Sequence, residues 1–516
     1  MFSDHTRAFV ALLVLTVFSL ALTRWLLKGT TLYEAFERRR NYWLLAVVIT
    51  FAVSNIFAAM ALLGLLFFYA ARKDPQPIGI YMMFLVAIPP AAQDISGFGP
   101  INQLFTINSM RMLSLVVLLP LGLQLMFAPK PKGPPRNMAP RLTDVTVILL
   151  ATYVLLAHTP IETVTQLMRR MFHIFFDFVL PYFVISRYVR DRAAVNDALG
   201  ALLVAGLILA PVAAFEHFKG WLLYESVHAN WEQPGMISLF LMRDSVLRSM
   251  TSAGHSLVLG HFFVVCFGLL GIFRQQFKRW RLVVVWGLLA IGLYATVSRG
   301  PWVAAALVIL AMGLFTGKVL KFYGWVALTT ALATVALLFS PWGEKVINFL
   351  PFIGNVDSSN VDYRQQLLDT TWLLIQQRPL FGSVMILEQM EHLRQGQGII
   401  DLVNVYADYA LHYGLIGLGL FVLFLGSGFL HGLFLSLKSR KKDREMFFMA
   451  GNTTVALMGS MILLVGISNY HTIPRIYTAL VALLVVMARL SRQPSARPSA
   501  LRPGLNNQNA GALTTT

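Results

Sequence analysis

The sequence has little charge and almost no cysteine. Of its 516 residues, 13% are charged and 57% are hydrophobic, and the mean hydropathy is +0.65. A soluble globular domain carries about a quarter charged residues, so this composition excludes that class and indicates a polytopic membrane protein. The single cysteine, Cys266, lies in an apolar run, which excludes a disulfide framework and a thiolate metal site.

Acidic residues are scarce as well. The chain has 24 Asp and Glu against 42 Lys and Arg, which gives a net charge of +18. The basic residues lie in short clusters between apolar runs, a distribution typical of cytoplasmic loops, so we predict no nucleic-acid partner. One cluster, FERRR at 36–40, does not fit this pattern if the early apolar segments all cross the membrane. Five clusters can share one side of the membrane: 130–136, 187–192, 274–281, 438–444 and the tail beyond 491.

Long apolar segments recur along almost the whole chain. About fourteen are close to the length that spans a bilayer, and several are short. We therefore predict an all-α fold, a transmembrane bundle of about twelve to fourteen helices with one large, partly helical, outward-facing loop. The expected regions are 1–127 with N-terminal transmembrane helices, 128–340 with a transmembrane core and an outward loop at 217–255, 341–410 with the large periplasmic loop, 411–490 with C-terminal transmembrane helices, and 491–516 with a disordered cytoplasmic tail.

The large loop has its own helical pattern. Ser359 and Asn360 are residue types that cap helix N-termini, and apolar residues follow at helical spacing until Pro379. We expect an amphipathic helix that lies on the membrane or packs over the bundle.

Arginines gather on the predicted outward side. Arg243 and Arg248 precede a helix, Arg299 lies in the turn SRGPW, and Arg364 lies near the start of the loop helix. The planar guanidinium group donates two parallel hydrogen bonds and cannot lose its charge, so arginine suits a diphosphate ligand. We predict that these groups surround one cavity. The alternative is that each arginine marks an interface or pairs with a nearby acid.

A histidine follows the first of these arginines. In RSMTSAGHSLVLG, His255 stands just ahead of a spanning helix, whose free N–H groups and dipole favour an anion. His255 is a candidate proton donor or phosphate ligand, and a capping or interfacial role is the alternative. His261 does not share a helical face with it, and no other metal motif appears. We predict no metal and no cofactor.

The stretch VNVYADYALHYGLIG begins with polar residues and ends in an apolar segment. Asn404, Asp408 and His412, with Asp401 just before them, fall at helical spacing and form a polar stripe. Tyr406 belongs to a second, aromatic stripe. Acids at a membrane mouth are functional candidates by default, and an exposed helix end with an interfacial aromatic belt is the alternative.

Three features together resemble the O-antigen ligase and O-antigen polymerase superfamily of polytopic glycosyltransferases: Arg248 with GHSLVLG, SRGPW, and YRQQLLDTTWLLIQQRPLFG followed by VNVYADYALHYGLIG. The ligase signature is His, then Asn, Ser or Gln, nine residues, Gly, two residues, and Gly, Thr or Tyr. Asn404, Gly414 and Gly417 fit this spacing, but Val403 replaces the histidine. That histidine is a proposed catalytic or acceptor-activating residue of ligases. Its absence favours a member similar to exopolysaccharide polymerases, with Asp401 as the replacement base.

The resemblance implies a metal-independent glycosyltransferase of the bacterial inner membrane with its active site facing the periplasm. It implies an undecaprenyl-diphosphate-linked saccharide as donor, the lipid bilayer as environment, and other polysaccharide assembly and export proteins as possible partners. The catalytic residues would be Asp401 as base, with Arg248 and Arg299 neutralising charge on the leaving diphosphate. The diphosphate or glycan would be bound by Arg243, His255, Arg364, Asn404, Asp408 and Tyr406.

Two other functions remain open from the sequence. An O-antigen ligase would transfer glycan to lipid A or protein with the same donor chemistry. A polysaccharide flippase or other transporter would have a similar number of helices, but transporters usually show related halves and discontinuous helices. The absence of a clear repeat and the presence of one dominant loop favour an enzyme.

Overall fold

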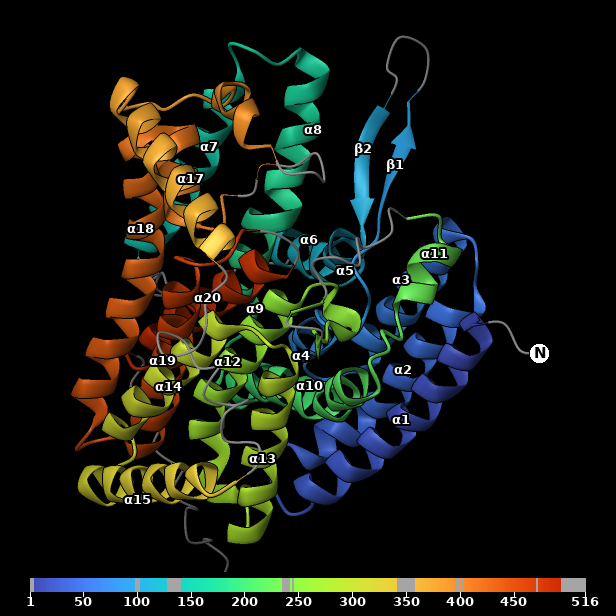
Figure 1. The fold of residues 1–516 in the computed structure, drawn as a ribbon, viewed down its shortest axis with the longest axis vertical. Coiled ribbons are helices and arrows are strands. Elements are labelled where there is room, and N and C mark those ends of the chain that lie inside the picture. The colour runs from blue at the N-terminus through green and yellow to red at the C-terminus, as the bar shows by residue number, and fades with distance from the viewer. Residues whose placement is uncertain are drawn as a thin grey trace, which may run out of the picture.

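The computed structural model describes residues 4–97, 103–127, 141–233, 242–243, 246–340, 358–394, 400, 402–469 and 472–492. Within these residues the chain is a bundle of helices with two short β-hairpins (Figure 1). The predicted all-α, polytopic transmembrane bundle is therefore confirmed.

The first half of the chain builds one side of the bundle. Two π-helical segments, Ser114–Leu118 and Phe175–Val179, join α5 to α6 and α8 to α9. The helices are α1 (Asp4–Leu27), α2 (Tyr33–Ala52), α3 (Ile56–Lys73), α4 (Pro77–Phe84), α5 (Ser109–Leu113), α6 (Leu119–Phe127), α7 (Arg141–His158), α8 (Val164–Ile174), α9 (Leu180–Tyr188), α10 (Arg192–Lys219) and α11 (Glu225–Asn230).

The second half contributes the long helices of the other side. Three 3₁₀ segments accompany them, Thr251–Ala253, Arg274–Gln276 and Ile386–Leu393. The helices are α12 (Ser256–Phe273), α13 (Arg279–Ala295), α14 (Arg299–Leu314), α15 (Val319–Leu338), α17 (Ser358–Gln377), α18 (Val405–Ser439), α19 (Arg444–Leu463) and α20 (Ile473–Leu490). Helices α10, α12 and α20 are buried along most of their length and form the core.

Nine helices in the described ranges are long and apolar enough to span a bilayer, and two shorter apolar helices accompany them. The apolar segment near residue 85 is not such a helix. It folds as α4, which has 8 residues, all of them buried in the bundle. The apolar segment near residue 56 is two helices, α2 and α3, because Asn55 caps a new helix by accepting a hydrogen bond from the backbone of Ala58.

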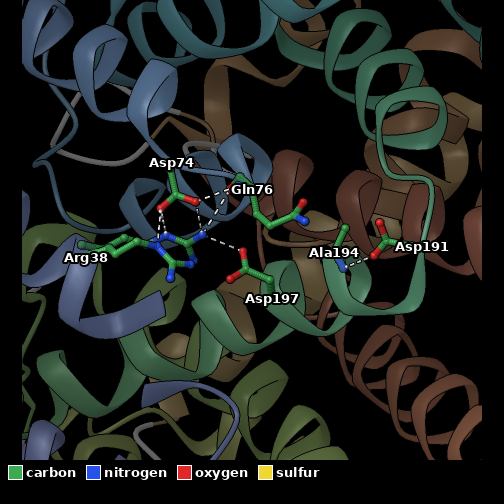
Figure 2. Close-up of polar contacts among 7 residues, drawn as sticks. Arg38, Asp74, Gln76, Asp191, Ala194 and Asp197 are labelled. Atoms are coloured by element: carbon green, nitrogen blue, oxygen red, sulfur yellow. Dashed lines mark hydrogen bonds and ion pairs between the residues drawn. The ribbon is translucent and has the colours of Figure 1, made fainter. Parts of the chain in front are cut away.

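The basic cluster 36–40 is tied into the bundle by Arg39, which is 2% exposed. Its Nε donates to Asp74 over 2.8 Å, and its Nη2 donates to Asp197 over 2.7 Å. Figure 2 shows the carboxylates of Asp74, which follows α3, and of Asp197, on α10, pointing at the same guanidinium group. A buried arginine paired in this way has its charge compensated inside the protein.

This pairing also places the cluster 36–40. Asp197 lies in the second turn of α10, directly after the basic segment 187–192. Thr31 lies between α1 and α2, and its backbone N–H donates to Oε1 of Gln276 over 2.9 Å. Gln276 belongs to the basic segment 274–281. Cluster 36–40 therefore lies on the same side as these two basic connections and does not break the charge pattern.

Two hairpins were not foreseen from the sequence. Strands β1 (Ala92–Ser96) and β2 (Gln103–Asn108) pair antiparallel, with an irregularity between Ile95 and Ser96, and the short strands β3 (Met242–Arg243) and β4 (Val246–Leu247) also pair antiparallel. Helix α8 packs on β2, with Arg169 donating to the carbonyl of Gln103 over 2.7 Å. The β1–β2 hairpin, α8 and α17 lie toward one end of the molecule, and α15 crosses the other end (Figure 1).

The predicted loop helix is present as α17, and Pro379 follows its end. Leu367, Thr371 and Ile375 form its buried face, while Leu368 and Trp372 are exposed on another face. The buried face packs against Ile386–Leu393 and the first turns of α18. Residues 341–357 of the predicted loop lie outside the described residues.

Candidate functional site

The first two motifs are joined by hydrogen bonds. Nη2 of Arg248 donates to Oγ of Ser298 over 2.8 Å, and Nε of Arg248 donates to the carbonyl of Thr296 over 3.4 Å. The backbone N–H of Ser249 donates to the carbonyl of Ala295 over 2.9 Å. Arg299, the first residue of α14, follows Ser298 directly. The structure therefore brings Arg248 to the turn that carries Arg299.

The third motif reaches the same place through the C-terminal end of α19. The backbone N–H of Val405 donates to the carbonyl of Leu464 over 2.8 Å, and the hydroxyl of Tyr406 donates to the carbonyl of Met461 over 2.9 Å. On the other side of α19, a Cβ on Gly300 would lie 4.0 Å from the side chain of Leu463. We call Arg248, Ser298, Arg299 and Asn404 the motif centre.

Three helices begin at the motif centre. His255 caps α12, its Nδ1 accepting a hydrogen bond from the N–H of Leu257 over 3.1 Å. Asn404 caps α18, its Oδ1 accepting hydrogen bonds from the N–H groups of Tyr406 and Ala407. Helix α14 starts beside α12, where a Cβ on Gly260 would lie 2.7 Å from Cγ of Pro301. Several helix N-termini near two arginines make a favourable environment for an anion.

The backbone of the centre is held in an unfavourable conformation. Among the described residues, four that are not glycine have a positive φ, and three of them lie in or directly before the three motifs: Thr251 at 48°, Val297 at 46° and Val403 at 36°. All three are β-branched, and such residues rarely adopt left-handed backbone angles. Strain of this kind concentrates at functional sites, where the surrounding structure enforces it.

A buried carboxylate missed by the sequence analysis positions the Arg248 segment. Oε2 of Glu216, on α10, accepts hydrogen bonds from the hydroxyl of Ser249 and from the N–H groups of Met250 and Thr251, over 2.7, 3.1 and 2.9 Å. Oε1 accepts from the N–H of Leu223 over 3.2 Å. Glu216 is 1% exposed. An acid inside a predicted membrane helix was the signal that identifies it.

The glycines of the third motif mark a break in α18. Gly414 has φ 64° and ψ −172°, and the chain 379–383 enters the gap. The N–H of Leu415 donates to the carbonyl of Pro379 over 2.7 Å, and the N–H of Ser383 donates to the carbonyl of Leu411 over 3.0 Å. Gly414 and Gly382 meet backbone to backbone, so neither position has room for a Cβ. These glycines hold RPLFG against the start of α18.

The remaining predicted site residues either make other contacts or lie outside the described residues. Tyr406 ties α18 to α19, and the carboxylate of Asp408 lies 3.0 Å from Nδ1 of His412. Asp401 and the side chains of Arg243 and Arg364 lie outside the described residues, so their predicted roles stay predictions. In the part of the chain that the structure describes, no cluster of three or more possible metal ligands occurs.

The comparison with known families agrees with this geometry. Residues 282–422 match the family model of the O-antigen ligases, from α13 to the first part of α18. This match, over part of the chain, supports the resemblance to the O-antigen ligase superfamily. The matched region contains Arg299 and Asn404, while Arg248 lies outside it and is joined to it through Ser298. No curated protein sequence matches the chain. The match supports a membrane enzyme of the O-antigen ligase and polymerase type.

Proposed function

We propose that this protein is a metal-independent glycosyltransferase that polymerises undecaprenyl-diphosphate-linked oligosaccharide repeat units into an exopolysaccharide or O-antigen-like polymer. The reaction takes place at the periplasmic face of the bacterial inner membrane. The observation that carries the proposal is the hydrogen bond from Arg248 to Ser298, which holds one guanidinium beside Arg299 where three helices begin.

The proposed reaction forms a bond between an acceptor hydroxyl oxygen and the anomeric carbon of the donor sugar. The bond from that carbon to the diphosphate breaks, and undecaprenyl diphosphate leaves with the electron pair. Arg248 and Arg299 stabilise the negative charge that develops on the leaving diphosphate, assisted by the dipoles of α12 and α14. Arg243, Arg364 and His255 add donors to the diphosphate or the glycan.

The acceptor hydroxyl must lose its proton during this transfer. We assign that role to Asp401, which stands two positions before Val403, the residue that replaces the signature histidine. Asn404 and Tyr406 support this assignment indirectly, because they anchor the first turn of α18, which begins shortly after Asp401 in the sequence. Asp408, one turn further along α18, contacts the glycan in this proposal.

The ligase function is the second candidate, because the matching family model is described as O-antigen ligase. A ligase would use the same donor site and would differ in the acceptor. Val403 favours the polymerase, since a ligase would lack its acceptor-activating histidine.

The test is polymer production in cells that lack their own copy of the gene. Wild type is compared with Arg248→Ala, Arg299→Ala and Asp401→Asn, and the amount of each protein in the membrane is measured. Arg274→Ala is the control, because Arg274 also donates to a backbone carbonyl, that of Thr316, in another part of the bundle. Each site variant should lower polymer yield by roughly a hundredfold or more, and the control should not.

The lipid-linked intermediates separate the candidate functions. Single repeat units that accumulate at the periplasmic face support the polymerase. Long lipid-linked polymer that remains untransferred would identify a ligase, and repeat units retained at the cytoplasmic face would identify a flippase. Full polymer yield from Arg248→Ala would contradict the proposed role of the motif centre.

A further inference from the structure

A second pair of arginines, outside the three motifs, lines a cavity of its own. Arg111 and Arg475 both contact the carboxylate of Asp177, Arg111 through Nε and Nη2 over 2.7 to 3.0 Å and Arg475 through Nη2. These side chains line a cavity of about 520 Å³ at the base of the β1–β2 hairpin. We call it the arginine cavity.

The lining of the arginine cavity combines polar and basic groups with apolar residues. It contains two guanidinium groups and one carboxylate, together with the amides of Asn108, Gln233 and Asn469. His228 also lines it, and burial lowers the pKa of this imidazole, so it is neutral at neutral pH. Amide and guanidinium donors around a basic cavity suit a phosphorylated ligand.

An apolar groove of about 480 Å³ adjoins the arginine cavity. Its floor is one face of α3, where Phe57, Ala61, Gly64 and Phe68 follow one another at helical spacing over three turns, or roughly 17 Å. Its opposite wall is formed by Met112, Leu115 and Val116. The groove is therefore long, apolar and parallel to a helix that can span the membrane.

The base of the hairpin forms a wall of both spaces. Ala92 and Asn108 are paired across the hairpin and line the cavity, whereas the next residue on β2, Ile107, lines the groove. Side chains alternate between the two faces of a strand, which explains why consecutive residues face different spaces. The cavity and the groove therefore lie on the two faces of the hairpin's base, so a ligand with its head group in the cavity must pass this base to place an apolar chain in the groove.

We propose that the arginine cavity and the groove together bind a polyprenyl diphosphate, with the diphosphate in the cavity and the first isoprene units in the groove. This lipid is the acceptor, and the diphosphate of the donor occupies the motif centre. That assignment rests on the proposed polymerase function.

The two sites are neighbours, as transfer between two lipid-linked saccharides requires. Pro90 lines the arginine cavity, and its other side packs so closely on Gly254 that a Cβ there would overlap the ring. Gly254 immediately precedes His255, the cap of α12. The hydroxyl of Ser252 donates to the carbonyl of Val86, which fixes the same contact.

Binding to the purified full-length protein in lipid nanodiscs tests the site without requiring polymerisation. The probes are a polyprenyl diphosphate, the corresponding polyprenol and inorganic diphosphate. Asn108→Asp adds a negative charge to the cavity while keeping a good N-cap for α5, since the side chain at 108 accepts from the N–H of Arg111. Asn55→Asp is the matched control, because it changes the same residue type at the cap of α3 outside the cavity.

A second variant pair tests the groove. Ala61→Trp fills it, and Leu62→Trp places the same side chain on an exposed face of α3 that does not line it. The expected result is that Asn108→Asp and Ala61→Trp each weaken polyprenyl diphosphate binding by roughly tenfold or more, while both controls bind as wild type does. Inorganic diphosphate and polyprenol should each bind far more weakly than the intact lipid.

Several results would overturn the proposal. Unchanged lipid binding by Asn108→Asp would show that the diphosphate does not bind in the cavity. Unchanged binding by Ala61→Trp would show that the isoprene chain does not bind in the groove. Inorganic diphosphate that binds as tightly as the lipid would identify a soluble ligand instead. If lipid binding behaves as expected but Arg248→Ala cells still make polymer, the lipid site stands and the proposed mechanism fails.

Discussion

The motif centre and the arginine cavity hold their guanidinium groups in different ways. In the motif centre, Arg248 donates to the neutral oxygens of Thr296 and Ser298, which orient its guanidinium group. In the arginine cavity, Arg111 and Arg475 bind a shared carboxylate, Asp177. The hydrogen bonds of the motif centre hold a guanidinium group in place for a reacting anion, whereas the shared carboxylate compensates the charge of two arginines inside the protein.

The backbone conformations of the two sites also differ. Thr251, Val297 and Val403, which lie close to the residues of the motif centre in the sequence, have positive φ, whereas none of the described residues that line the arginine cavity does. Strain at the motif centre is consistent with preorganisation for a reaction. Its absence from the cavity fits a site that only binds.

Asp177→Asn should have the largest effect on stability. It leaves Arg111 and Arg475, 12% and 4% exposed at their side chains, beside a neutral amide. We expect a loss of about 3 kcal/mol in the free energy of unfolding, measured as a fall in the thermal midpoint. Asp369→Asn, an exposed position on α17, is the control. A thermal midpoint equal to that of wild type would show that the shared carboxylate of Asp177 does not stabilise the arginine cavity.

Arg248→Lys should have the largest effect on transfer with little effect on stability. Lysine keeps the charge but cannot donate to Thr296 and Ser298 while also contacting a diphosphate with a planar fork. We expect polymer yield to fall by about a hundredfold and the thermal midpoint to stay near that of wild type. Full activity of this variant would mean that charge alone suffices.

Glu216→Gln tests whether the Arg248 segment must be held in place. The amide nitrogen of glutamine faces a backbone N–H where Glu216 presents an acceptor, so at least one hydrogen bond is lost, at a cost of about 1 to 2 kcal/mol. We expect kcat to fall more than KM rises, because Arg248 is displaced relative to the leaving group. The control is Glu225→Gln, an exposed residue at the start of α11. Equal kinetics for the two variants would exclude a positioning role.

His228→Gln should have the smallest effect on stability, and this effect should appear only when the pH is changed. Burial lowers the pKa of His228 below 6.5 in the folded protein. As the pH falls below that value, the unfolded chain takes up a proton that the folded chain does not, so stability decreases. The variant lacks this group and should lose less stability than wild type between about pH 7 and about pH 5. Exposed His392→Gln serves as the comparison, and identical pH profiles for His228→Gln and wild type would contradict the expectation.

Sequence patterns predicted individual helices and turns better than they predicted which elements pack against one another. The helix now seen as α17 and the turn ahead of Arg299 follow from local signals, namely helical spacing, capping residues and Pro379. Asn404 was expected in a polar stripe, and its role as the cap of α18 was missed. The split of one apolar segment into α2 and α3 was missed, because hydropathy reports length and not the cap at Asn55. The β1–β2 hairpin was missed because a strand pair this short carries little periodicity.

The candidate site was predicted in part for the same reason. Arg248, Arg299 and Asn404 were recognised from motifs, and their meeting follows from hydrogen bonds between chain segments far apart in the sequence. Glu216 and Asp177 were not assigned, since an acid in an apolar helix signals a function without naming its partner.

The sequence by itself determined that this is a polytopic helical membrane protein with motifs similar to those of the O-antigen ligases, because apolar length, charge distribution and short motifs are properties of the chain read in order. Only the tertiary structure decided that Arg248 lies against Ser298, that Gly414 admits RPLFG, and that Arg111 and Arg475 share one carboxylate beside an apolar groove. Each of these depends on atoms brought within hydrogen-bonding or van der Waals distance by helix packing, and no local pattern encodes which helices become neighbours.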